Sequence, residues 1–88
     1  MSWVVNLTGD SEKFLKKNNL DPEEVFELIR RAVKKFRGDT IAIDIRKLKG
    51  NWRGFYRIRR GDLRIIASFD FDKSSVFIEV IDWRGNVY

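Results

Sequence analysis

Apolar residues recur in the first half of this chain at the spacing of an amphipathic helix. Between residues 21 and 37 they return every three or four positions, so that one face of a helix is apolar and the other charged. The start of this helix is well marked, because Asp21 suits the N-cap and Pro22 the first helical position. Gly38 is expected to end it. The apolar positions are Val25, Leu28, Ile29, Ala32, Val33 and Phe36.

Two short elements are predicted upstream of that helix. Residues 3–7 are rich in apolar side chains and favour a strand. A brief helix follows, with Asp10 or Ser11 as its cap, and the pair Asn18-Asn19 is expected to break it.

Beyond Gly38 the period changes from that of a helix to that of strands. Residues 40–45 lead into a basic segment, and three runs that favour strands follow it. These runs are Phe55–Arg60, Leu63–Asp70 and Ser75–Trp83. Gly61-Asp62 is expected to form a two-residue hairpin turn, because glycine tolerates a positive φ. We therefore expect one α+β domain over residues 1–88, in which a short N-terminal strand and two helices pack on a curved antiparallel sheet (β-α-α-β-β-β).

The predicted turn also determines which side chains share a face of the sheet. With Gly61-Asp62 at the turn, Arg59 lies opposite Arg64, Arg57 opposite Ile66, and side-chain alternation puts the three arginines on one face. The opposite face carries the residues suited to packing under the long helix, namely Tyr56, Ile58, Ile65 and Ala67. Like charges directly opposite each other destabilise a ladder by up to about 1 kcal/mol, so this arrangement is best explained by an anion that neutralises it.

Composition excludes several kinds of chemistry. The chain has no cysteine and no histidine, which removes disulfides, thiolate chemistry, the commonest metal ligand and imidazole catalysis. It has no run of about 18 apolar residues, and its first residues lack the pattern of a signal peptide. We expect a soluble, cytoplasmic protein that needs no cofactor and has no membrane partner.

The positive charge is concentrated in one segment. Residues 46–64 hold eight Lys or Arg against the single Asp62, a local balance of +7 in a chain of net charge +5, so the rest sums to −2. Such a block is typical of a protein that binds a polyanion, and nucleic acid is favoured over a membrane because no amphipathic helix carries the charge. A solvated face that only keeps the protein soluble is the alternative.

Three guanidinium groups on one face suit a phosphodiester. Arginine binds phosphate oxygens with two parallel hydrogen bonds, and several arginines would stabilise the added charge of a pentacovalent transition state without a metal. The alternative is that these arginines form salt bridges with Asp70, Glu79, Asp82 or an acidic partner protein.

Further candidates for RNA contact surround this patch. Trp52, Phe55 and Trp83 would stack on unpaired bases, although packing in the core is the alternative for each of them. The basic residues expected to contact RNA are Lys47, Lys49, Arg53 and Arg60.

The basic segment and the end of the chain resemble a known family. Residues 47–50 (KLKG) and 55–66 (FYRIRRGDLRII), with the ending WRGNVY at residues 83–88, are similar to the sheet and C-terminal motifs of the RelE/ParE toxin superfamily. The resemblance is specific over roughly the last 42 residues and implies the same α+β fold. It also implies a toxin of a type II toxin–antitoxin module that enters the ribosomal A site and cleaves mRNA. The 2′-hydroxyl would attack the adjacent phosphate, leaving a cyclic phosphate and a 5′-hydroxyl.

The resemblance also assigns roles to residues. Arg57 and Arg59 take the places of two basic residues near the scissile phosphate, Arg64 that of the sheet arginine, and Arg84 and Tyr88 those of a C-terminal basic residue and the terminal tyrosine. The family's best-known enzymes have lysine at the first two places, whereas arginine, with a pKa above 12, cannot readily exchange a proton. Tyr88 is therefore the candidate general base and Glu79 a weaker one.

Three hypotheses follow from these patterns. The first is a ribosome-dependent endoribonuclease held inactive by an acidic, partly disordered antitoxin that places carboxylates among the arginines. The second is a ParE-like toxin that inhibits DNA gyrase. The third is an inactive relative that binds only nucleic acid or antitoxin.

Overall fold

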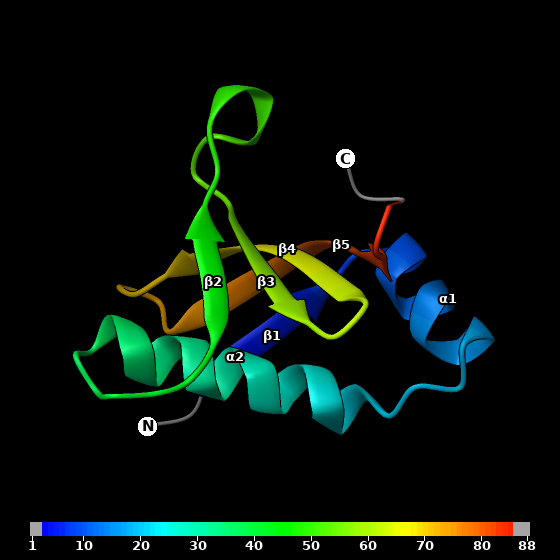
Figure 1. Cartoon of the computed structure of the whole chain (residues 1–88), viewed down its shortest axis with the longest axis horizontal. Helices are drawn as coiled ribbons and strands as arrows, with labels where there is room; N and C mark the ends of the chain where they lie inside the picture. The colour runs from blue at the N-terminus through cyan, green and yellow to red at the C-terminus, as the bar shows by residue number, and fades with distance from the viewer. Residues whose placement is uncertain (1–2, 86–88) are drawn as a thin grey trace.

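The computed structural model describes residues 3–85, which form two helices and five strands (Figure 1). The order along the chain is β1 (Val4–Leu7), α1 (Gly9–Lys17), α2 (Pro22–Phe36), β2 (Asp44–Lys47), the short 3-10 turn η1 (Gly50–Trp52), β3 (Tyr56–Arg60), β4 (Leu63–Asp70) and β5 (Ser75–Trp83). This is the α+β class that the sequence predicts.

The five strands form one mixed sheet in the order β1-β5-β4-β3-β2. β1 runs parallel to β5, and every other neighbouring pair is antiparallel. The strand β2 differs from the prediction, which left residues 40–50 without a strand. It pairs with β3 and places Ile45 opposite Ile58, so the expected three-stranded meander has four strands.

The hairpin of β3 and β4 has the predicted register. Arg59 lies opposite Arg64 and Ile58 opposite Ile65, with Gly61 at a φ of 57° in the turn. Only glycine adopts this conformation without steric cost, so the two-residue turn fixes both the register and the faces.

The start of α1 is a correction to the predicted cap. Thr8, not Asp10 or Ser11, is the N-cap: its backbone is extended, and its Oγ1 accepts a hydrogen bond from the Ser11 N–H. Ser11 itself is buried within the helix. For α2 the prediction is confirmed, because Asp21 caps the helix and Pro22 begins it.

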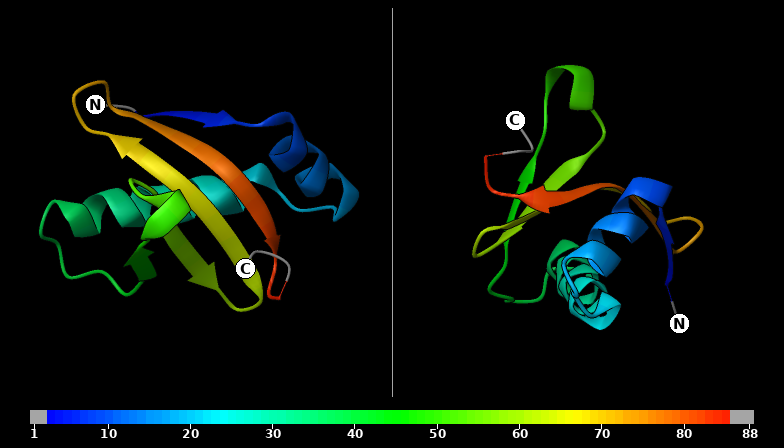
Figure 2. Two further views of the ribbon diagram at one scale, coloured as in Figure 1. Left: turned by 90° about the horizontal axis from the view of Figure 1, so that it is seen from above. Right: turned by 90° about the vertical axis from the view of Figure 1, so that its right-hand side faces the viewer.

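The helices cover one face of the sheet and leave the other, here called the open face, without a helix, although Ile66 and most of the Arg57 side chain are buried there. Figure 2 shows α2 lying along one side of the sheet. Five of its apolar residues share one hydrophobic core with β3, β4, β5 and Leu15 of α1, namely Val25, Leu28, Ile29, Ala32 and Val33. Ile58, Ile65 and Ala67 are fully buried there. Phe36, at the end of α2, is partly exposed and contacts the ring of Tyr56 at a centroid distance of 4.9 Å. The predicted division of the hairpin into an apolar and an arginine face is therefore confirmed.

Candidate nucleic-acid interface

The open face of the sheet presents the predicted arginines in two neighbouring rows. Cross-strand pairing places Asp44, Arg59 and Arg64 in one row and Arg46 and Arg57 in the next. Side chains two residues apart along a strand point the same way at about 6.7 Å spacing, so the guanidiniums of these rows belong to one surface. We call Arg57, Arg59 and Arg64 the arginine patch.

A carboxylate of β2 binds two members of the arginine patch. Asp44 Oδ1 accepts from Arg57 Nη2 at 3.0 Å, and Asp44 Oδ2 lies 2.5 Å from both Nε and Nη2 of Arg59. The two carboxylate oxygens thus bridge two guanidiniums, as two oxygens of a phosphate would.

This contact lowers the pKa of the Asp44 carboxyl. Desolvation acts to raise the pKa of its carboxyl, but the hydrogen bonds and charges of Arg59 and Arg57 outweigh that effect and lower the pKa below its ordinary value. Asp44 is therefore ionised at neutral pH and offsets part of the patch's charge.

Asp44 is a salt-bridge partner that was not considered from the sequence. The alternative named Asp70, Glu79 and Asp82, whereas the carboxylate found on Arg57 and Arg59 is that of Asp44. Of the three residues named, Asp82 lies directly opposite Arg64 in the register. The strand β2 brings Asp44 to Arg57 and Arg59, and because that strand was not predicted, the pairing was missed. The alternation Ile41, Ile43, Ile45 was the signal that could have indicated a strand.

Glu79 lies apart from the arginine patch. The register between β4 and β5 shifts at Ile66/Ala67, which leaves Glu79 as the extra residue of a bulge. Its carbonyl accepts from the Thr8 hydroxyl, and the residue lines a hollow beside α1. This position does not favour Glu79 as a general base for a phosphate held by Arg57 and Arg59.

The three arginines are held in different ways. Arg57 is nearly buried, with 11% of its side chain exposed, and its Nε finds no hydrogen-bond partner among residues 3–85. Arg59 is about half exposed. Arg64 donates from Nη1 to the carbonyls of Gly61 at 2.6 Å and Leu63 at 3.1 Å. Arg64 is thus held by backbone dipoles, and the register places Asp82 of β5 directly opposite it.

The four basic residues predicted to contact RNA outside the patch fall into two groups. Lys49 and Arg53 flank η1 in the β2–β3 connection, which projects beyond the sheet (Figure 1). Lys47 lies opposite Tyr56 and Arg60 opposite Leu63, so the register puts both on the side of the sheet that α2 covers, although both are exposed. Only the first group lies where a ligand on the open face could reach it without turning around the sheet edge.

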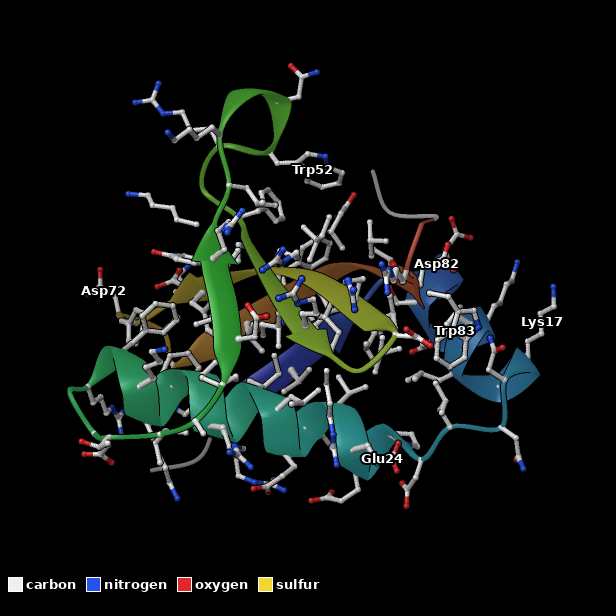
Figure 3. All side chains as sticks on the ribbon, in the orientation of Figure 1. Lys17, Glu24, Trp52, Asp72, Asp82 and Trp83 are labelled. Carbon is white, nitrogen blue, oxygen red and sulfur yellow. The ribbon has the colours of Figure 1, made fainter. Side chains whose placement is uncertain are left out.

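The aromatic candidates are already engaged with other rings. Trp52, in the projecting connection (Figure 3), contacts Phe55 edge-to-face at 5.5 Å. Trp83 packs on Phe14 at 5.4 Å and donates its indole N–H to Asn18. None of the three belongs to the hydrophobic core, and Trp83 is 37% exposed, so base stacking by these side chains stays a prediction.

The C-terminal candidates are only partly described. The Arg84 backbone N–H donates to the Asp62 carbonyl at 2.7 Å, which brings Arg84 beside the turn at the Arg59–Arg64 end of the sheet. Its side chain is exposed there. Tyr88 lies outside the described residues, so its role as a base remains a prediction.

Two further observations concern metals and membranes. Within residues 3–85, acidic side chains do not gather in a group of three or more that could bind a metal ion. Neither helix in this part of the chain is long and apolar enough to span a membrane.

Comparison with known proteins relates this architecture to toxins. No family model and no curated protein matches the sequence. Among solved structures, a chain of the RelBE2 toxin–antitoxin complex from Mycobacterium tuberculosis is 21% identical and superposes with a TM-score of 0.61, covering 96% of this chain and 100% of that one. A chain of the DinJ–YafQ toxin–antitoxin complex from E. coli is 13% identical and has a TM-score of 0.68, covering 100% of this chain and 99% of that one. A chain of the archaeal RelE–RelB complex from Pyrococcus horikoshii is 22% identical and has a TM-score of 0.59, covering 99% of this chain and 100% of that one. The chain has the RelE-like α+β fold.

Proposed function

We propose that this protein is the toxin of a type II toxin–antitoxin module and acts as a ribosome-dependent, metal-independent endoribonuclease on mRNA. The observation that carries the proposal is the arginine patch on an uncovered sheet face, in the fold of the RelE and YafQ complexes. The cationic β2–β3 connection, with Lys49 and Arg53, would extend the same surface along the RNA backbone.

In the proposed reaction the arginine patch supplies positive charge, and proton transfer is left to other groups. The 2′-oxygen attacks the adjacent phosphorus, the bond from phosphorus to the 5′-oxygen breaks, and a 2′,3′-cyclic phosphate and a 5′-hydroxyl result. Arg64, together with Arg57 and Arg59, would stabilise the extra negative charge of the pentacovalent phosphorane. The proton leaving the 2′-hydroxyl goes to a base, for which Tyr88 is the candidate, and the 5′-oxygen takes up a proton as it leaves.

Inhibition follows from the same electrostatics. An acidic, partly disordered antitoxin would place carboxylates on the arginine patch, as Asp44 does within the chain. Two neighbours of this fold were solved as complexes named for an antitoxin, RelB and DinJ, which supports a partner of this class.

The test is to induce the protein in cells and map the 5′ ends of a reporter mRNA. One reporter carries a start codon and the other, otherwise identical, lacks it. Cuts within codons of the first reporter alone support a ribosome-dependent nuclease. Equal cutting of both reporters would reject ribosome dependence. Intact mRNA with broken DNA would replace the proposal with gyrase inhibition, and no effect on either would indicate an inactive relative.

A further inference from the structure

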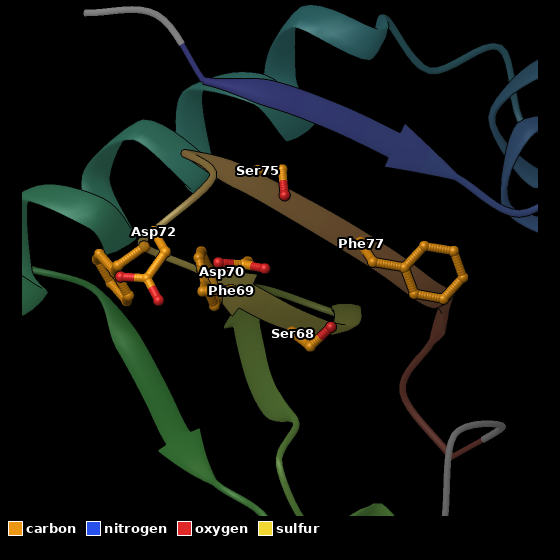
Figure 4. A pocket seen from close by; sticks show the side chains of 7 residues that line it. Ser68, Phe69, Asp70, Asp72, Ser75 and Phe77 are labelled. Carbon is orange, nitrogen blue, oxygen red and sulfur yellow. The ribbon is translucent and has the colours of Figure 1, made fainter.

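The open face has a second region that differs in chemistry from the arginine patch. At the other end of β4 and β5 a hollow of about 570 Å³ is lined by Ser68, Phe69, Asp70, Phe71, Asp72, Ser75 and Phe77 (Figure 4). No lysine or arginine lines it. A phosphate is therefore not the group that this surface suits, and a neutral group that donates hydrogen bonds is favoured.

The exposed ring of Phe77 indicates a ligand with a flat aromatic ring. It is 40% exposed on the open face, where pairing places it opposite Ser68 of β4 and Asn6 of β1. Unlike Trp52, Phe55 and Trp83, it packs against no other aromatic ring of residues 3–85. An exposed, unpaired phenyl ring beside polar side chains is a platform on which a nucleobase can stack.

The polar residues beside Phe77 would select among bases. Asp70 pairs with Ser75 in the next row, so it lies diagonally across from Phe77 at roughly 7–8 Å, a span that a stacked base can bridge. Asp70 Oδ1 accepts from the Lys73 backbone N–H at 3.1 Å, and an ionised carboxylate has further lone pairs to offer. A carboxylate accepts hydrogen bonds from the exocyclic amino groups of cytosine, adenine and guanine, a donor that uracil lacks.

The two regions lie close enough to serve one RNA strand. Arg57 pairs with Ile66, two residues before Ser68, so Phe77 is one row along and two strands across from Arg57. At about 6.7 Å per row and 4.8 Å per strand, the separation is about 12 Å. Ile66 and Val80 share the row of Arg57, where Ile66 is fully buried and Val80 half-buried. A strand whose phosphate contacts the arginine patch would thus place a neighbouring base over Phe77.

We propose that the hollow at Phe77 is a nucleobase subsite, in which Phe77 stacks on the base and Asp70 accepts from its exocyclic amino group. This inference rests on the proposed function, since it requires that RNA lies on the open face. It adds a sequence preference, for adenine, cytosine or guanine over uracil at one position near the scissile bond.

The test uses short single-stranded oligouridylates that carry one central adenine, cytosine, guanine or uracil. The ribose 5′ of each linkage is 2′-deoxy so that cleavage is blocked, and binding is measured by fluorescence anisotropy. We expect the parent to bind the three amino-bearing oligomers about 5- to 150-fold more tightly than the uracil one, the range of a good hydrogen-bonded base contact. Phe77→Ala should weaken binding of all four by a similar factor, as loss of one stacked base does.

The variants separate the two parts of the inference. Asp70→Asn keeps an oxygen for the Lys73 N–H but replaces the second carboxylate oxygen with a donor, so the preference should disappear while binding of the uracil oligomer stays. Val4→Ala, which shortens another exposed apolar side chain of the same face, is the matched control and should bind as the parent does.

The outcomes distinguish failure of the nucleobase subsite from failure of the proposed function on which it rests. If the parent binds all four oligomers equally, or Phe77→Ala binds as the parent does, the subsite is wrong while RNA binding by the arginine patch stands. If the parent binds none of the oligomers and cuts no message, the proposed function fails and the subsite fails with it.

Discussion

Arg64 differs from its neighbours in the arginine patch because its described hydrogen bonds go to backbone carbonyls and not to Asp44. Asp44 binds Arg57 and Arg59, whereas Arg64 donates to the carbonyls of Gly61 and Leu63. A guanidinium held by neutral dipoles is fixed in place and still available to an anion. This is the property that stabilisation of a transition state requires.

Replacing Arg64 with alanine should therefore abolish cleavage and leave the fold intact. Loss of one preorganised charge donor typically costs about 3–4 kcal/mol in the transition state, or roughly 10²–10³ in rate. The free energy of unfolding should change by no more than about 1 kcal/mol, because Arg59 loses a like charge on one side of residue 64 while Asp82 loses an opposite charge on the other. The measurements are mRNA cleavage and thermal unfolding beside the parent.

The matched control is Arg60→Ala, which removes an arginine from the covered side of the same hairpin. It should affect cleavage far less than Arg64→Ala. An Arg64→Ala protein that folds and cuts at the parental rate would remove Arg64 from the site, and one that unfolds readily would make it a structural residue.

Asp44 should contribute stability that depends on pH. Its folded-state pKa lies below the ordinary value of 3.8, so its contribution is present above that value and is lost as pH falls through the lower, folded-state pKa. We expect Asp44→Asn to unfold at a lower temperature than the parent at pH 7, and the gap to close in acid. Thermal unfolding of both proteins from pH 7 to pH 2 measures this.

The control for Asp44 is Asp39→Asn, which removes another carboxylate just upstream of β2. Its unfolding temperature at pH 7 should differ from that of the parent by less than that of Asp44→Asn does. A gap between Asp44→Asn and the parent that stays constant down to pH 2 would mean that the contribution of Asp44 does not arise from its ionised form.

At the scale of elements, α1 depends on a cap that also connects it to the sheet. Thr8 Oγ1 accepts from the Ser11 N–H at 3.1 Å and lies 3.1 Å from the Glu79 carbonyl oxygen, to which it donates. The hydroxyl therefore satisfies a free helix donor and joins the helix start to the bulge of β5.

Thr8→Ala should lower the free energy of unfolding by about 1–2 kcal/mol, the upper part of the range for an N-cap. Thr8→Ser, which keeps the hydroxyl, should lose less than half of that. Chemical denaturation of the two variants and the parent gives the comparison. If the alanine and serine variants are equally stable, the cap does not hold α1.

At the scale of the molecule, the positive charge is distributed unevenly in space. The projecting β2–β3 connection carries Lys49 and Arg53, while Lys16 and Lys17 lie in the last turn of α1. Figure 3 shows Trp52 in the connection and Lys17 on α1, well apart in the same view. The first pair lies in the projecting connection, whereas Lys17 lines the hollow beside α1 with Val80 and Asp82, so the two pairs should differ in their effect on RNA binding.

A double variant, Lys49→Ala with Arg53→Ala, should reduce the salt dependence of RNA binding. Each phosphate contact adds about 0.7 to the slope of log K against log salt for a single strand, so the slope should fall by roughly 1.4. The variant Lys16→Ala with Lys17→Ala removes the same charge and should keep the parental slope. Equal slopes in both double variants would place the RNA elsewhere.

The sequence by itself determined the features that depend on local geometry. The apolar spacing from residue 21 to 37 predicted α2, and Gly61-Asp62 predicted the register that puts Arg57, Arg59 and Arg64 on one face. A turn of two residues fixes the pairing of its strands, and strict alternation then fixes the faces, so both can be derived from a few adjacent residues.

Only the tertiary structure decided how that face is neutralised and what lies beside it. Asp44 reaches Arg57 and Arg59 because β2 pairs with β3 across the β2–β3 connection, and Phe77 borders Ser68 and Asn6 because β5 pairs with both β4 and β1. These contacts join segments that are up to 71 residues apart, such as Asn6 and Phe77. No local pattern specifies which carboxylate lies beside the arginines or which aromatic ring lies on the open face. Pairing between distant strands is set by how the whole sheet buries its apolar face.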